Sequence, residues 1–185
     1  SQPDLGLLGW TSALHAHDPT VIQTIEYLPI HNWLLQNLEH TGMTSAWFDS
    51  FHDNIKNDVH GQLYSTTTIM KQIVELHEYD SGSTPYSDRN QVIKFMISHD
   101  EQSVIQEMVE FSNYTLSQAR ERDKFYATIL FTSLGVPMLL QGQEFGFKSG
   151  WLDDNGNGNW DEEKLDYRPL DWDLVDTDAG QNHLE

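Results

Sequence analysis

The chain has 185 residues, with 29 aspartates and glutamates against 10 lysines and arginines, which gives a formal net charge of −19. A chain this acidic would repel a phosphate backbone, so nucleic acid is not expected as a partner. The sequence has no cysteine, no secretory signal at its start and no apolar run near the roughly 20 residues of a membrane span, which excludes disulfides and thiolate chemistry and argues against a membrane partner.

Four short apolar runs, each ending beside polar residues, predict parallel β-strands. In chain order they span residues 21–25, 45–48, 95–98 and 135–140. The first three lead directly, or within two residues, into Glu26, Asp49 and Asp100. A buried parallel strand needs an apolar body, and parallel α/β proteins meet their ligands at the carboxyl ends of the strands. The polar ends of these runs therefore predict one face of an enzyme.

Segments with helical spacing precede and separate these runs. They predict helices over about residues 5–17, 69–76, 104–111 and 117–134. The first of these helices should end at Asp18, because the residue before a proline resists the helical conformation. The order is thus a helix followed by four strand–helix units, with the last helix absent or degraded.

Alternating strands and helices predict an α/β fold with a parallel sheet. A (β/α)8 TIM barrel takes about 250 residues for its eight units. Four units correspond to half of such a barrel, and the chain begins within a predicted helix, without a methionine or a capping box. We therefore expect a fragment of a larger protein.

Four motifs stand in a fixed order along the chain. They are Ile25-Glu-Tyr-Leu-Pro29, Trp47-Phe-Asp-Ser-Phe-His52, Ser98-His-Asp-Glu101 and Gly135-Val-Pro-Met-Leu-Leu-Gln-Gly-Gln-Glu-Phe-Gly146. Together they resemble glycoside hydrolase family 13, the α-amylase family, and are most similar to its 1,4-α-glucan branching enzymes. The resemblance implies strands five to eight of the barrel, with residues 1–150 as its C-terminal half. Residues 151–185 would form an acidic loop and the segment that leaves the barrel.

The resemblance also implies roles for three side chains in a retaining reaction on an α-glucan such as glycogen, starch or amylose. Retention requires an acid that protonates the leaving oxygen and a carboxylate about 5 Å away that attacks the anomeric carbon. Glu26 matches the general acid/base, and its apolar flank would help to keep it protonated. Asp100 matches a third acid that grips the sugar hydroxyls, and His99 matches a histidine that hydrogen-bonds the same sugar. The structural alternatives are a helix cap for Glu26 and a turn or ion pair for His99 and Asp100.

Three more side chains are candidate substrate contacts. Gln141 and Glu144 would lie at the edge of the site after the last strand, although the neighbouring glycines equally fit a tight turn. Trp47 belongs to a stretch that resembles the acceptor side of branching enzymes. Its alternative is an aromatic packing corner in which Asp49 caps a helix.

The nucleophile of the family is missing from these residues. It lies in a Gly-Phe-Arg-x-Asp pattern after the fourth strand, and Asp49 does not fit because Trp47 stands where the arginine should be. The resemblance therefore implies that the nucleophile lies upstream of Ser1, and that the N-terminal half of the barrel is a partner of this chain.

Three functions stay open. A branching enzyme would pass the glucan to a 6-hydroxyl and would favour a cytoplasmic location, although the sequence itself leaves the compartment open. An α-amylase-type hydrolase would pass the glucan to water. The third is a catalytically dead carbohydrate-binding or structural remnant.

The chemistry requires no cofactor, but one segment is a candidate for a structural calcium ion. Its oxygen donors fall at positions 1, 3, 5 and 9 of a calcium-loop pattern, occupied by Asp153, Asn155, Asn157 and Asp161. Position 12 holds Lys164 where a bidentate glutamate is needed. A turn rich in glycine and asparagine is the alternative.

Overall fold

The computed structural model describes residues 6–26, 41–61, 66–76, 86–148 and 169–184. Its centre is a four-stranded sheet made of β1 (Thr24–Ile25), β2 (Ser45–Trp47), β3 (Val92–Phe95) and β4 (Val136–Met138). The strands lie side by side in chain order, and each pair is parallel. The predicted α/β fold with sequential parallel strands is confirmed.

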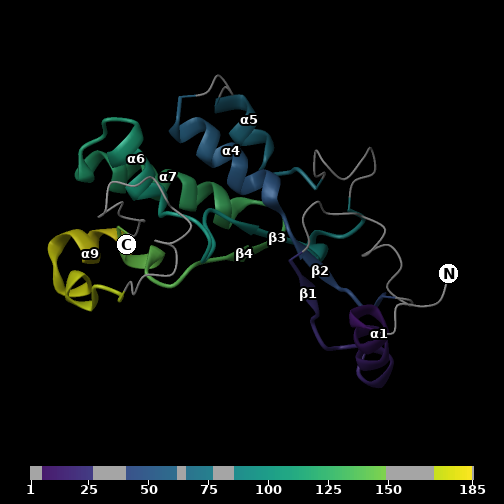
Figure 1. Cartoon of the computed structure of the whole chain (residues 1–185). Helices are drawn as coiled ribbons and strands as arrows, with labels where there is room; N and C mark the ends of the chain where they lie inside the picture. Colours follow the sequence, from purple (N-terminus) through teal and green to yellow (C-terminus); the bar gives the residue numbers. More distant parts are fainter. Residues whose placement is uncertain (1–5, 27–40, 62–65, 77–85, 149–168, 185) are drawn as a thin grey trace, which may run out of the picture.

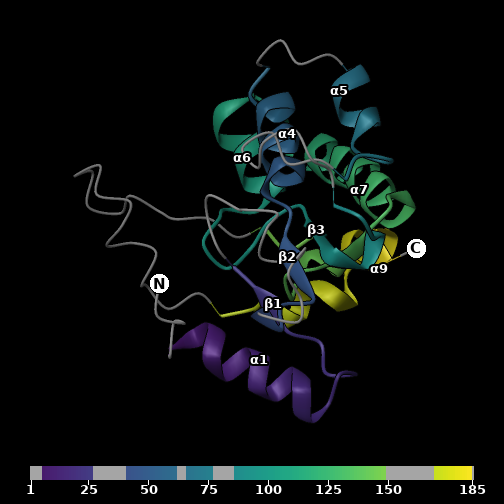
Figure 2. The same cartoon turned by 90° about the vertical axis from the view of Figure 1, so that its right-hand side faces the viewer.

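A group of helices lies on one side of this sheet, as Figures 1 and 2 both show. They are α4 (Asp49–Val59), α5 (Thr66–Lys71), α6 (Val104–Phe111) and α7 (Leu116–Thr132). The core between helices and sheet includes Phe48, Phe51, Val92, Met108 and Tyr126, each with at most 1% of its surface exposed. Burial of this apolar face is the main force that holds the helices on the sheet.

The helix α1 (Leu7–His17) lies beside β1 and is joined to it by polar contacts. The amide of Gln23 donates to the backbone oxygens of Thr11 (2.9 Å) and Gly42 (2.8 Å). The helix ends at His17, followed by Asp18 in an extended conformation, as the proline after it predicts.

Capping residues explain why α6 and α7 begin where the sequence predicts. Ser103 accepts a hydrogen bond from the backbone N–H of Gln106 at the start of α6. At the start of α7, Thr115 and Gln118 form a reciprocal capping box. Side-chain oxygens at these positions satisfy N–H groups that have no partner within the helix.

The chain after β4 folds into short elements that pack on one another. They are η2 (Gln143–Phe145), η3 (Trp172–Asp176) and α9 (Asp178–Leu184), whereas η1 (Arg89–Gln91) precedes β3. His183 of α9 contacts Asp123 of α7, with 3.1 Å between Nε2 and Oδ2. This contact connects the last described helix to the helical layer.

Several predicted boundaries are wrong. The third strand spans 92–95 rather than 95–98, because Lys94 interrupts the apolar pattern although it is only 1% exposed. Its Nζ lies 5.2 Å and 5.7 Å from the ring centres of Phe48 and Phe51, which stabilise the buried cation. The first strand covers only 24–25, and the helix predicted over 69–76 ends at Lys71 and continues as a turn.

The last strand is short, and its side chains are not buried as predicted. β4 covers 136–138 rather than 135–140, and Val136 is 38% exposed. It is an edge strand with β3 as its single neighbour in the described sheet, so its other edge is unpaired there.

The helix α4 was considered only as a helix that Asp49 would cap, and its extent was not predicted. Its apolar residues Phe51, Ile55 and Val59 recur every four positions, which is the signal that could have found it. Asp49 is the first residue of this helix rather than its N-cap, which is Phe48.

Over the described residues, no helix combines the length and apolar character needed to cross a membrane. The predicted division of the chain at 150/151 falls within residues 149–168, which lie outside the described ranges, and stays a prediction.

Candidate functional site

Predicted site residues lie at the carboxyl ends of all four strands. Glu26 follows β1 directly, Trp47 is the last residue of β2, and Asp100 stands in the turn after β3. Gln141 lies three residues beyond the end of β4. Because the strands are parallel, these residues share one edge of the sheet, where parallel α/β proteins bind ligands.

Glu26 is exposed at this edge. The pairing of Ile25 with Ala46 makes Glu26, one residue further along, level with Trp47 on the neighbouring strand. Of the apolar flank expected around this carboxyl group, Ile25 is buried, at 9% exposure, whereas Ile22 is 77% exposed. The other expected flank residues, at 28 and 29, lie outside the described ranges.

His99 and Asp100 form a contact with each other in the turn after β3. His99 Nε2 lies 3.4 Å from Asp100 Oδ1, and their side chains are 66% and 56% exposed. The backbone N–H of Asp100 donates to Ser98 Oγ at 3.2 Å. Both side chains are thus available to a ligand, while the turn beneath them is hydrogen-bonded. This geometry also fits the turn or ion pair considered as the alternative.

Trp47 reaches His99 across the sheet. Their ring centres are 6.2 Å apart at an interplanar angle of 74°, and the Trp47 ring also lies 5.1 Å from that of Phe95. The indole therefore packs against the base of the predicted site, as both the acceptor-side role and the packing-corner alternative require.

Gln141 and His99 line the same hollow, which has a volume of about 220 Å³. It is lined by both residues together with Ile97, Glu101, Ser103, Leu140, Gln143, Phe147 and Leu170. Apolar walls with a few polar groups are typical of sites that bind small molecules. The structure thus joins predicted residues from the ends of β3 and β4.

Glu144 is directed elsewhere. Its Oε2 accepts a hydrogen bond from the backbone N–H of Gly142 at 2.7 Å, and it does not line the hollow. Gly142 has φ +102°, and a Cβ there would approach Leu170 Cδ2 to 2.8 Å. The glycine-rich motif is thus a tight turn that only glycine fits. A substrate contact for Glu144 stays a prediction.

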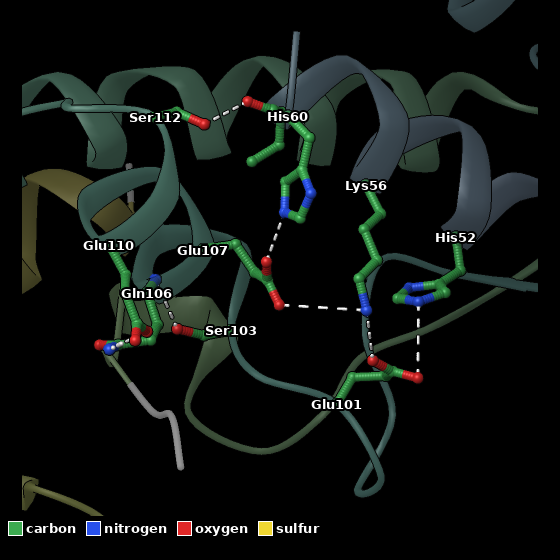
Figure 3. A network of polar contacts seen from close by, with 10 residues as sticks. His52, Lys56, His60, Glu101, Ser103, Gln106, Glu107, Glu110 and Ser112 are labelled. Atoms are coloured by element: carbon green, nitrogen blue, oxygen red, sulfur yellow. Dashed lines mark hydrogen bonds and ion pairs between the residues drawn. The ribbon is translucent and has the colours of Figure 1, made fainter. Parts of the chain in front are cut away.

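A group of charged residues beside the site was missed at the sequence level. Glu101, next to Asp100, accepts a hydrogen bond from Lys56 of α4 at 3.1 Å (Figure 3). Lys56 stands between His52 and His60 at intervals of four residues, a spacing that places all three on one helical face. Prediction of α4 would have revealed this polar stripe.

The charge of Lys56 is stabilised by its neighbours. Burial alone would lower its pKa, but the charge and hydrogen bond of Glu101, aided by Glu107 and Asp53, outweigh burial and raise the pKa above its usual value. The ammonium group is therefore fully charged at neutral pH, and its ion pair with Glu101 persists.

The predicted calcium ligands Asp153, Asn155, Asn157 and Asp161 lie outside the described residues, so calcium binding stays a prediction. Within the described ranges, no cluster of three or more histidine, aspartate and glutamate side chains is arranged to hold a metal ion.

The sequence matches no protein-family model and no curated protein. Solved structures do resemble the chain. A pullulanase from Anoxybacillus sp. LM18-11, in complex with maltotetraose, superposes with a TM-score of 0.65 at 19% identity, covering 96% of this chain and 27% of that one. A putative α-amylase from Salmonella typhimurium gives 0.64 at 16% identity, covering 100% and 39%. A pullulanase from Klebsiella pneumoniae gives 0.56 at 11% identity, covering 98% and 26%.

These likenesses show a shared fold. The chain spans about a quarter to two fifths of the length of the solved proteins that it matches. Its four-stranded parallel sheet is thus similar to part of the fold of known α-amylases and pullulanases.

Proposed function

We propose that the chain belongs to glycoside hydrolase family 13 and forms the C-terminal half of a (β/α)8 barrel. The parent would be an α-glucan-active retaining enzyme, and in particular a 1,4-α-glucan branching enzyme. The observation that carries the proposal is positional: the four motifs that resemble this family stand, in order, at the ends of four sequential parallel strands. The fold shared with α-amylases and pullulanases supports it independently.

In the proposed reaction, Glu26 protonates the glycosidic oxygen as the α-1,4 bond breaks. An aspartate from the preceding strand of the barrel, which these residues do not include, forms the bond to the anomeric carbon. The 6-hydroxyl of a second glucan then attacks that carbon, the aspartate leaves, and the hydroxyl proton passes to Glu26. No cofactor is consumed, and the number of glycosidic bonds is unchanged.

Asp100 and His99 would hold the sugar during both steps. A carboxylate beside a ring that becomes positively charged stabilises the transition state more than the ground state. The side chain of Asp100 is 56% exposed, and that of His99 is 66% exposed. Both are therefore accessible to a sugar that approaches the carboxyl ends of the strands.

The proposal makes the N-terminal half of the barrel the structural partner of this chain. In the described sheet, β1 and β4 each have a neighbour on one side only. Unpaired strand edges readily hydrogen-bond to further strands, and closure of the barrel would satisfy both edges.

An α-amylase-type hydrolase is the second candidate, and the structural neighbours favour it, since they are pullulanases and α-amylases. The two functions share the first half of the reaction and differ in whether water or a sugar accepts the glycosyl unit.

The products of amylose distinguish these functions. The full-length natural polypeptide that contains these residues should create α-1,6 links, seen by proton NMR, with little gain in reducing ends. Hydrolysis would instead raise reducing ends without new links. If the polypeptide bound maltooligosaccharides but formed neither product, it would be a carbohydrate-binding remnant, and the proposal of catalysis would be wrong.

A further inference from the structure

The loop between β3 and α6 must hold two exposed side chains in place. It carries His99 and Asp100, whereas Ser98 and Gln102 on either side are buried, at 5% and 4% exposure. Catalytic groups lose effectiveness when they move by even about 1 Å from their working geometry. Some interaction from outside the loop is therefore needed to fix it.

His52 of α4 contacts the loop at both of its ends. The imidazole stacks on Phe95 at an interplanar angle of 13°, and its Nδ1 lies 2.6 Å from the carbonyl oxygen of Met96. A carbonyl oxygen can only accept, so Nδ1 must carry a proton and donate. The opposite nitrogen, Nε2, then lies 3.7 Å from Oε1 of Glu101.

Lys56, one helical turn beyond His52, completes the contact. Its Nζ donates to Oε2 of Glu101 at 3.1 Å and lies 4.0 Å from Oε1 of Glu107 on α6. His60, a further turn along, lies 2.6 Å from the other oxygen of Glu107. Figure 3 shows these side chains as a row on α4 that faces the loop and α6.

The orientation of Glu101 separates its role from that of Asp100. Glu101 lines the same hollow as His99, but its carboxylate oxygens point to Lys56 and His52, as Figure 3 shows. Its side chain is 26% exposed, against 56% for Asp100. A carboxylate held by a lysine of its own chain is suited to fix the backbone rather than to bind sugar.

We propose that Lys56 and His52 are positioning residues, together called the clamp. Lys56 holds the carboxylate of Glu101 and His52 holds the carbonyl of Met96, and so they fix the loop that presents His99 and Asp100. This inference rests on the function proposed above. It predicts that the clamp affects turnover more than substrate binding, because a loose loop can still touch the sugar without holding the geometry of the transition state.

The test uses Glu101→Gln and Lys56→Met in the full-length natural polypeptide, with amylose as substrate. Each substitution should lower kcat about tenfold or more and change KM less than about threefold. The double variant should be no worse than either single one, because both remove the same contact. Lys56→Arg keeps the positive charge and should restore kcat to within about threefold of the natural protein.

Asp58→Asn is the matched control. Asp58 is also on α4 and pairs with Arg122 of α7 at 2.6 Å, away from the loop. Its loss should lower the melting temperature by an amount similar to that of Lys56→Met and leave kcat within about twofold. Equal losses of kcat in the control and the clamp variants would mean that stability, not positioning, explains the effect, and would overturn the inference.

Amide hydrogen exchange gives a readout that does not depend on activity. The N–H groups of Asp100 and Glu101 donate to Ser98, and their protection should fall about tenfold or more in Lys56→Met but not in Asp58→Asn. Unchanged protection would overturn the clamp. If the natural protein did not act on amylose, the proposed function would fail, while exchange would still decide whether the clamp holds the loop.

Discussion

The rings of Trp47 and His99 meet edge to face, with 6.2 Å between their centres. The two residues stand 52 positions apart, Trp47 at the end of β2 and His99 after β3, yet the parallel register brings them together at the edge of the sheet. The residue predicted for the acceptor side and the histidine predicted to bind the sugar are therefore in contact with each other.

The roles of Glu26 and Asp100 can be separated by the leaving group of the substrate. In the full-length natural polypeptide, both Glu26→Gln and Asp100→Asn should reduce reaction with amylose by about a hundredfold or more, while binding survives. An activated leaving group needs little protonation, so it should rescue formation of the glycosyl-enzyme in Glu26→Gln but not in Asp100→Asn.

Burst kinetics with an activated glucoside would measure this difference. Glu121→Gln is the control, because Glu121 is a glutamate on α7 whose side chain is 69% exposed. Near-normal reaction of both site variants with amylose would show that these residues are not the acid/base and the stabilising carboxylate.

The Asp123–His183 pair should make stability depend on pH. Burial raises the pKa of Asp123 above its usual 3.8, although the hydrogen bond and charge of His183 oppose the shift. A raised carboxyl pKa means that the folded state binds the proton more tightly than the unfolded state. The contribution of Asp123 to stability is therefore greatest below the unfolded pKa and is lost as pH rises towards the raised folded value.

Asp123→Asn removes this titration with little change of shape. The melting temperature of the variant, relative to the natural chain, should therefore rise as the pH increases above about 4, the usual pKa of an aspartate. Calorimetry across this range measures the difference. A difference that is constant with pH would show that Asp123 titrates alike in the folded and unfolded states.

The isolated 185-residue chain should be marginally stable and should associate. In the described sheet, β1 and β4 are edges, and Phe131 and Leu139 near β4 are 58% and 39% exposed. Unpaired edges and exposed apolar side chains promote association and loose packing. Sedimentation and near-ultraviolet circular dichroism test this, and a sharply melting monomer with strong aromatic signals would contradict it.

Calcium should stabilise the chain weakly if residues 153–161 form a site. A free calcium concentration of about 100 times the dissociation constant would add about 2.7 kcal/mol to the free energy of unfolding. This gain appears as a higher melting temperature. Asp153→Ala should abolish the rise. Lys164→Glu, which supplies the missing donor at position 12, should increase the affinity. If magnesium raised the melting temperature as much as calcium, or if calcium did not raise it, the segment would not be a calcium site.

The sequence was most informative where local chemistry decides structure. Ser103 and Thr115 cap helices that begin within one residue of the predicted starts, and Pro19 marks the end of α1. The ends of the first two strands were also found to within one residue, because the change from apolar to polar residues reflects the change from sheet to site. These signals act over a few residues and can be read directly.

Long-range packing decided the rest. Lys94 is buried beside Phe48 and Phe51 at the start of α4, and its ammonium group donates to the backbone oxygen of Gln72; no local pattern shows this. The contact between Lys56 and Glu101 joins residues 45 positions apart, so it follows only from the placement of α4 on the sheet. The substrate roles of Gln141 and Glu144 likewise depended on which side chain enters the hollow, and Glu144 turns back onto its own loop.

The order of the strands has a consequence for how the chain acquires its fold. Among the described residues, each strand pairs only with those that precede and follow it in the sequence, so the sheet can grow by one unit at a time. Such growth never requires a late segment to insert between two early ones, which keeps contact order moderate for a parallel sheet. During synthesis on the ribosome, each new strand could pair with the strand synthesised just before it, at the growing edge of the sheet.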